Sequence, residues 1–115
     1  MDQFAADPPV ETQVGDELGE RTETLAIAEG CTGGIVATLL TDVPGASEYL
    51  DRAVVPYSYD SLRELLAVRR ETLDAHGVVS EPVTRELAQG IRDTADTTWG
   101  LATGGVAGPG GGTTG

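Results

Sequence analysis

The sequence predicts an α/β protein in which a layered sheet has helices on both faces. Two observations lead to this fold class. Runs of β-forming residues alternate with helical patterns, and glycine-rich turns at 28–34 and 104–113 follow two of the strands. Because ligands in such sheets bind beyond the strand ends, the two turns predict a single cleft. A chain of 115 residues with 39% hydrophobic composition is sufficient for one domain.

The first elements are a helix and a strand. Val10, Val14 and Leu18 recur at helical spacing and predict an amphipathic helix over 9–21, which two internal glycines weaken. The run at 24–27 predicts the first strand, which we expect over 22–28. It leads directly into the first glycine-rich turn.

A short apolar helix is predicted after this turn. Residues 34–41 are nearly all apolar, so we expect this helix to be buried on most sides, and the turn residues at 42–45 end it. A brief helical turn is expected at 47–52. The β-forming run at 53–59 predicts the second strand, and Pro56 makes it an edge strand or gives it a bulge.

The second half predicts two helices and a strand. Asp60 is the expected N-cap of a helix with three leucines on one face. Ser80 followed by Glu81-Pro82 is typical of a helix start, and apolar residues then recur at every fourth position to Ala95. Residues 97–103 predict the third strand, which ends at the second glycine-rich turn.

The charge balance is strongly acidic. Nineteen acidic residues oppose seven basic ones, all arginine, for a net charge of -12. This composition indicates adaptation to high salt and argues against a nucleic-acid partner. The acidic residues of the first helix are best interpreted as a solvated face. One cysteine excludes an internal disulfide, and the absence of signal-peptide features and of an apolar run of about 20 residues predicts a cytoplasmic protein without membrane contact.

Several residues are candidates for chemistry, each with a structural alternative. The glycines of the first turn let a backbone approach a ligand, and the helix start behind them attracts an anion such as phosphate. Cys31 is either an activated thiolate or a small packed residue, and His76 is either a general base or a helix C-cap. Ser47 either attacks a substrate or caps a helix, and Tyr57 and Ser58 either face the cleft or pack in the core. No metal-ligand cluster is evident.

Five blocks in order resemble one known family. They read LAIAEGCTGG from Leu25, LTDVPGAS from Leu40, VVPYS from Val54, HGVVSEPV from His76 and GVAGPGGGT from Gly105. Together they resemble the CinA C-terminal family of nicotinamide-nucleotide amidases. The resemblance implies a three-layer α/β/α domain with a mixed sheet over 9–115, preceded by a flexible acidic segment at 1–8. It also implies that the family's domain continues past the end of this chain.

The resemblance also implies site residues. A serine nucleophile falls on Ser47, and the lysine that activates it falls on Leu62 in a chain without lysine. Arg63 cannot replace this lysine because a guanidinium stays protonated. The residues implied to bind a pyridine mononucleotide are Gly30, Cys31, Thr32, Gly33, Gly34, Tyr57, Ser58, Gly105, Ala107, Gly108 and Gly110. The resemblance implies neither a cofactor nor a metal. It does imply that the protein forms a homo-oligomer.

Two further positions depart from the family pattern. The family usually has serine where Gly30 stands and threonine where Gly104 stands. We therefore expect an amidase-like domain whose hydrolysis of the carboxamide is impaired. The alternatives are a noncatalytic nucleotide-binding or oligomerisation module, and a decayed fragment.

Overall fold

The computed structural model describes residues 8–104. Its helices are α1 (Val10–Arg21), α2 (Ile35–Thr41), α3 (Tyr59–Leu66), α4 (Arg70–His76) and α5 (Glu81–Ala95), with a short 3-10 turn η1 (Ala46–Glu48). Its strands are β1 (Leu25–Glu29), β2 (Leu50–Val54) and β3 (Trp99–Thr103). The α/β fold class is therefore confirmed.

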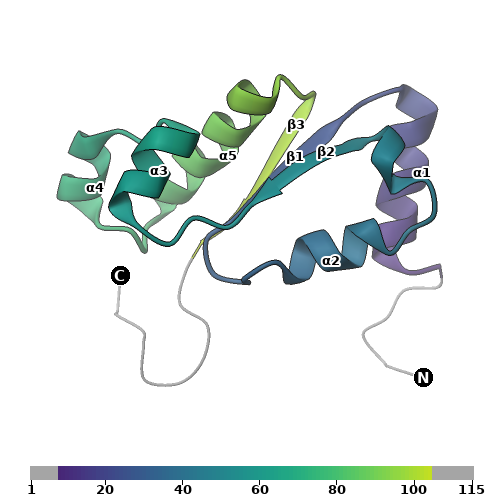
Figure 1. Cartoon of the computed structure of the whole chain (residues 1–115), viewed down its shortest axis with the longest axis horizontal. Helices are drawn as coiled ribbons and strands as arrows, with labels where there is room; N and C mark the ends of the chain where they lie inside the picture. The colour runs from purple at the N-terminus through teal and green to yellow at the C-terminus, as the bar shows by residue number, and fades with distance from the viewer. Residues whose placement is uncertain (1–7, 105–115) are drawn as a thin grey trace.

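The three described strands form one parallel sheet in the order β2-β1-β3. The expected mixed sheet is therefore not seen within 8–104. Each of the two connections between strands in this range includes at least one helix, and the following strand runs in the same direction. Helices α3, α4 and α5 lie on one face and α1 and α2 on the other (Figure 1). This is the three-layer arrangement that the family resemblance implied.

Alternation along β1 divides the core in two. Ala26 and Ala28 face the cluster that contains Leu66, Leu87 and Ile91, while Leu25 and Ile27 face the α1 and α2 side. All five residues of β1 are buried, as expected for the central strand of a parallel sheet. Small alanines on the α5 side let that helix pack closely on the sheet.

Glycines make two of these contacts possible. In α1, Gly15 lies against the ring of Tyr49, where a side chain on residue 15 would overlap the phenol. Gly90 in α5 lies against the backbone carbonyl of Leu66. The glycine that weakens α1 by local propensity is therefore required by its packing.

Most predicted elements are confirmed, with shifted bounds. The helix at 80–95 appears as α5 with Ser80 as its N-cap, which accepts a hydrogen bond from the Val83 amide. The helical turn expected at 47–52 is present as η1, but it ends at Glu48 because β2 begins at Leu50. Helix α4 was not predicted.

Three local expectations are corrected. The strand expected at 53–59 lies at 50–54, because Leu50 pairs with Leu25 and the chain leaves the sheet before Pro56. The N-cap of α3 is Ser58 rather than Asp60, since the Ser58 hydroxyl accepts from the Ser61 amide. Helix α2 buries only Leu40. Its outer face is open over the described range because α1 and β2 contact one side of it.

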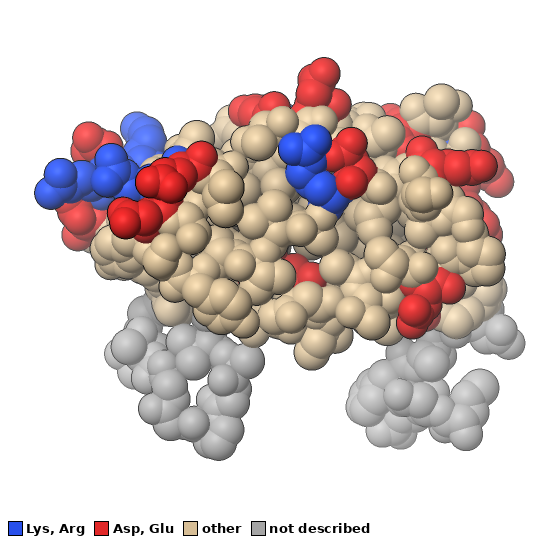
Figure 2. Space-filling view, in the orientation of Figure 1, with Lys and Arg blue, Asp and Glu red and all other residues tan. Residues whose placement is uncertain are grey.

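Acidic side chains are scattered over the molecular face in Figure 2, and basic ones on that face gather mainly over the α3 and α4 end. Several arginines pair with acids one turn away on exposed helix surfaces, such as Arg21 with Glu17 and Arg85 with Glu81. Such pairs contribute little to stability because water screens them. No helix between residues 8 and 104 is both long and apolar enough to cross a bilayer.

Candidate functional site

One cleft lies where the three strands end. It is a cavity of about 190 Å³ lined by Gly30, Pro56, Tyr57, Ser58, Tyr59, Leu62, Val78, Leu87 and Gly104. Gly30 follows β1, Pro56 lies just after β2 and Gly104 follows β3. The Gly30 amide donates to the carbonyl of Thr103 at 2.7 Å, so the chain segments that leave β1 and β3 are joined at the cleft. A position beyond the carboxyl ends of parallel strands is where α/β sheets bind ligands.

Gly30, Tyr57, Ser58 and Leu62 line this cleft together. Leu62 is 4% exposed and belongs to the α5-side core, so it forms the apolar floor of the cavity. Tyr57 is 88% exposed. A side chain on Gly33 would lie 3.8 Å from the Tyr57 hydroxyl, so the Tyr57 phenol extends from the cleft to the first glycine-rich turn.

Ser47 lies elsewhere. It is exposed in η1, before the amino end of β2, and lines a separate cavity of about 520 Å³ with residues of the 41–46 turn. Leu62 follows the carboxyl end of the same strand, and five residues of strand span roughly 13 Å. The structure therefore does not bring Ser47 and Leu62 together within one chain.

The first glycine-rich turn is organised by Glu29. This carboxylate is fully buried and accepts from the amides of Val36 and Ala37 at 3.0 Å each and from the Thr32 hydroxyl. Burial acts to raise the pKa of Glu29, but these hydrogen bonds and one from the Gly34 amide outweigh it and hold the pKa below its ordinary value. Glu29 is thus an anion that the protein itself places at the start of α2.

The position of Glu29 corrects one expectation. An anion such as phosphate was expected at the start of α2, but the anion there is the protein's own Glu29 carboxylate, and a ligand phosphate would meet this buried negative charge. Sequence reasoning missed Glu29, although an acidic residue that ends an apolar strand just before a helix start is the available signal. Gly33 and Gly34 adopt positive φ values of 63° and 104°, which lets the turn bring these amides around Glu29.

The remaining candidates have structural places. Thr32 is bonded to Glu29 and lies 3.1 Å from the Thr103 hydroxyl, and Cys31 is a partly buried free thiol in the same turn. His76 ends α4 before Gly77. Gly105, Ala107, Gly108 and Gly110 lie outside the described residues, as does the GxGxxG pattern at 110–115. The part of the chain that is described contains no group of three or more side chains suited to hold a metal ion.

If Ser47 only caps or borders the turn, its hydroxyl is dispensable for the cleft. We expect Ser47→Ala to leave the affinity of the cleft for a ligand unchanged within twofold, because the two cavities are separate. Isothermal titration calorimetry measures this directly. A tenfold loss of affinity would contradict this expectation. It would place Ser47 at the ligand, although the two cavities are separate within one chain.

Known proteins resemble this chain closely. The family model for the CinA C-terminal domain matches residues 7–115. A CinA-like protein of Desulforapulum autotrophicum is 50% identical over 103 residues, which cover 90% of this chain and 24% of that protein. A CinA-like protein of Anaeromyxobacter sp. is 53% identical over 96 residues, 84% of this chain and 24% of its own length. The chain thus spans about a quarter of the curated relatives.

Solved structures agree. The competence/damage inducible protein CihA from Agrobacterium tumefaciens is similar, with a TM-score of 0.86 and 33% sequence identity. The match covers 99% of this chain and 70% of the Agrobacterium chain. A CinA superfamily protein from Enterobacter cloacae matches with a TM-score of 0.89 and 30% sequence identity. The match covers all of this chain and 68% of the Enterobacter chain. Its sequence matches the family over nearly its whole length, and its fold matches the solved structures. This chain therefore belongs to the CinA C-terminal domain family.

Proposed function

We propose that this chain is a nicotinamide-nucleotide amidase-type domain that holds the ring of a pyridine mononucleotide in the cleft without hydrolysing it. One observation supports this proposal above the others. The positions at which the family usually has serine, lysine and threonine are Gly30, Leu62 and Gly104, and all three line the same cleft. Three departures that are far apart in the sequence remove polar groups from one place.

Amide hydrolysis needs a nucleophile and a base. A hydroxyl must attack the carboxamide carbon while a neighbouring group takes its proton, and ammonia then leaves with a proton returned to it. In the cleft, the Ser58 hydroxyl accepts from the Ser61 amide and lies 2.9 Å from the Ser61 hydroxyl, so it is engaged in capping α3. Loss of a general base alone lowers a rate by about 10² to 10⁴, roughly 3 to 5 kcal/mol of barrier.

The size and walls of the cleft support binding of a ring. A cavity of about 190 Å³ is smaller than the roughly 300–1,000 Å³ typical of whole-ligand pockets, so it suits a single ring with the ribose and phosphate outside. Pro56, Tyr57, Leu62 and Leu87 supply apolar and aromatic surface, and no charged side chain lines the cavity in the described range. The ring of nicotinamide mononucleotide is a pyridinium cation, so the aromatic face of Tyr57 can attract it while the apolar walls pack against its carbon atoms.

The native chain is expected to release no ammonia from nicotinamide mononucleotide above a protein-free blank. Leu62→Lys alone is expected to stay silent as well, because Gly30 and Gly104 still lack hydroxyls. Those hydroxyls do not fit without movement: a Cβ on Gly30 would lie 2.6 Å from the Thr103 carbonyl oxygen, and one on Gly104 would overlap the Thr84 side chain. A coupled ammonia assay in molar potassium chloride measures both chains.

Binding is tested in parallel. Tyr57→Ala should weaken affinity for the mononucleotide about two- to tenfold by removing an aromatic wall, whereas Leu65→Ala, on the exposed side of α3, should not. Ammonia release that disappears in Ser47→Ala would overturn the proposal in favour of an active amidase. A folded chain that neither binds nor hydrolyses would support the alternative of a decayed domain.

A further inference from the structure

A threonine of α5 fills the space beside one wall of the cleft. An added Cβ on Gly104 would overlap the hydroxyl of Thr84 and would lie 3.1 Å from the Thr84 Cβ. Because the helix fixes that Cβ, rotation of the hydroxyl alone does not relieve the whole contact. Gly104 does not have a positive φ, so packing against Thr84 rather than backbone conformation excludes a side chain at residue 104.

The position of Thr84 on α5 brings it to the cleft. Thr84 and Leu87 lie three residues apart in the helix and therefore face the same side of it. Leu87 lines the cavity, and so does Gly104, against which Thr84 packs. Because residue 104 has no side chain, only its backbone lies between the partly buried Thr84 and the cavity.

The hydrogen bonds of Thr84 define what its oxygen can do. The hydroxyl donates to the Ser80 carbonyl at 3.0 Å, and the Thr84 amide donates to the same carbonyl. Between residues 8 and 104, no group donates to the Thr84 hydroxyl oxygen. The oxygen therefore keeps its lone pairs and can act as a hydrogen-bond acceptor.

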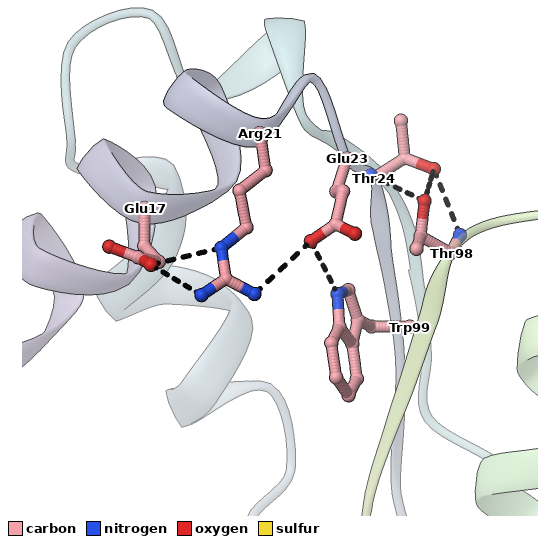
Figure 3. Close-up of polar contacts among 6 residues, drawn as sticks. All are labelled: Glu17, Arg21, Glu23, Thr24, Thr98 and Trp99. Atoms are coloured by element: carbon pink, nitrogen blue, oxygen red, sulfur yellow. Dashed lines mark hydrogen bonds and ion pairs between the residues drawn. The ribbon is translucent and has the colours of Figure 1, made fainter.

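The threonines at the opposite end of the sheet are bonded differently. Thr24 and Thr98 precede β1 and β3, and the backbone amide of each donates to the hydroxyl of the other at 3.1 Å (Figure 3). These two hydroxyls join the strands to each other. The Thr84 hydroxyl has no such partner within the described range, although it lies at the end of the sheet where the cleft is.

We propose that Thr84 is a specificity-determining residue of the cleft, whose hydroxyl accepts a hydrogen bond from an amide group on the bound ring. This inference rests on the proposed function, since it takes the ligand to be a pyridine mononucleotide. A carboxamide has two N–H donors, which suit an acceptor oxygen. A carboxylate has only acceptors, so the hydroxyl would have to give up its bond to Ser80 before it could donate to one.

Calorimetric titration with nicotinamide mononucleotide and with nicotinate mononucleotide, in molar potassium chloride, measures this selectivity. Thr84→Val nearly keeps the shape of the side chain and removes the hydroxyl. It should weaken binding of the amide about three- to tenfold, the effect of one lost hydrogen bond, and change binding of the acid by less than about twofold.

Thr94→Val is the matched control. Thr94 also lies on α5 and donates its hydroxyl to a backbone carbonyl, but it lies roughly 15 Å farther along the helix. This substitution should change neither affinity.

The outcomes separate the inference from the proposed function. If Thr84→Val binds both nucleotides as the native chain does, or loses affinity for both equally, the role of Thr84 is overturned and the proposed function stands. A native chain that binds neither nucleotide would overturn the proposed function and this inference with it.

A measurement without ligand checks the contact itself. Gly104→Ala should lower the urea midpoint of the native chain by about 0.5–1 M, because the added methyl group overlaps Thr84. In a Thr84→Ala chain the space is open, so the same substitution should lower the midpoint much less. Equal shifts in the two chains would show that Thr84 does not fill the space beside Gly104, and would overturn the inference.

Discussion

Replacing Gly90 by alanine is expected to destabilise the fold by about 3 kcal/mol. Helix propensity predicts the opposite sign, since alanine is about 1 kcal/mol more favourable than glycine inside a helix. In the structure, however, a Cβ on Gly90 would overlap the carbonyl group of Leu66, which is backbone and cannot rotate away. Helices α3 and α5 would have to separate, and overpacking of this kind typically costs 1–3 kcal/mol or more.

The same substitution at Gly19 is the matched control. Gly19 is exposed in α1, and an added Cβ has nothing within 4 Å, so Gly19→Ala should stabilise the chain by about 0.5–1 kcal/mol. Urea unfolding followed by circular dichroism in molar salt measures both. Equal effects of the two substitutions would show that α3 and α5 do not pack at Gly90.

Glu29→Gln is expected to cost about 3 kcal/mol of stability. The carboxylate accepts hydrogen bonds from two α2 amides and from Thr32, and bonds to a charged group contribute about 1.5–3 kcal/mol each. Glutamine keeps one acceptor oxygen, but its NH₂ group is itself a donor and would face the donors that now bind the second carboxylate oxygen. The turn at 30–34 would lose its organising group, so affinity at the cleft should fall as well.

The effect of Glu29 should depend on pH in a defined direction. Because the folded pKa of Glu29 lies below its ordinary value of 4.5, its stabilisation is fully present above pH 4.5 and is lost as the pH falls through the lowered folded pKa. The stability gap between the native chain and Glu29→Gln should therefore narrow in acid. Denaturant unfolding from pH 3 to 7 measures the gap.

Glu20→Gln is the control for this series, because Glu20 is exposed on α1 and should change stability by less than 0.5 kcal/mol at every pH. A gap for Glu29→Gln that is constant between pH 3 and 7 would contradict the assignment of Glu29 as the titrating group.

The candidate site could be predicted only in part. The sequence placed glycine turns after strands, and the structure joins the segments after β1 and β3 by the hydrogen bond between Gly30 and Thr103. The family resemblance implied that Ser47 and the lysine position, Leu62, act together, and within one chain the two lie on either side of β2. Sequence order alone gives no distance between two residues that flank a strand, because the packing of the other elements decides that distance.

Local chemistry determined the elements with strong signals. The serine cap, the following proline and the apolar repeat were enough to predict α5, because capping and burial of one helix face are set within about fifteen residues. The alternation of helices and strands determined the layered α/β class for the same reason. The strand at 50–54 was misplaced, since pairing with β1 rather than β-propensity decides which residues enter a sheet.

Only the tertiary structure decided what the cleft contains. Gly30, Leu62 and Gly104 are separated by dozens of residues, and no local rule brings them to one cavity. The buried role of Glu29 and the requirement for glycine at position 90 are decided in the same way. They depend on distances between elements, and those distances are fixed by packing of the whole core rather than by neighbours in the chain.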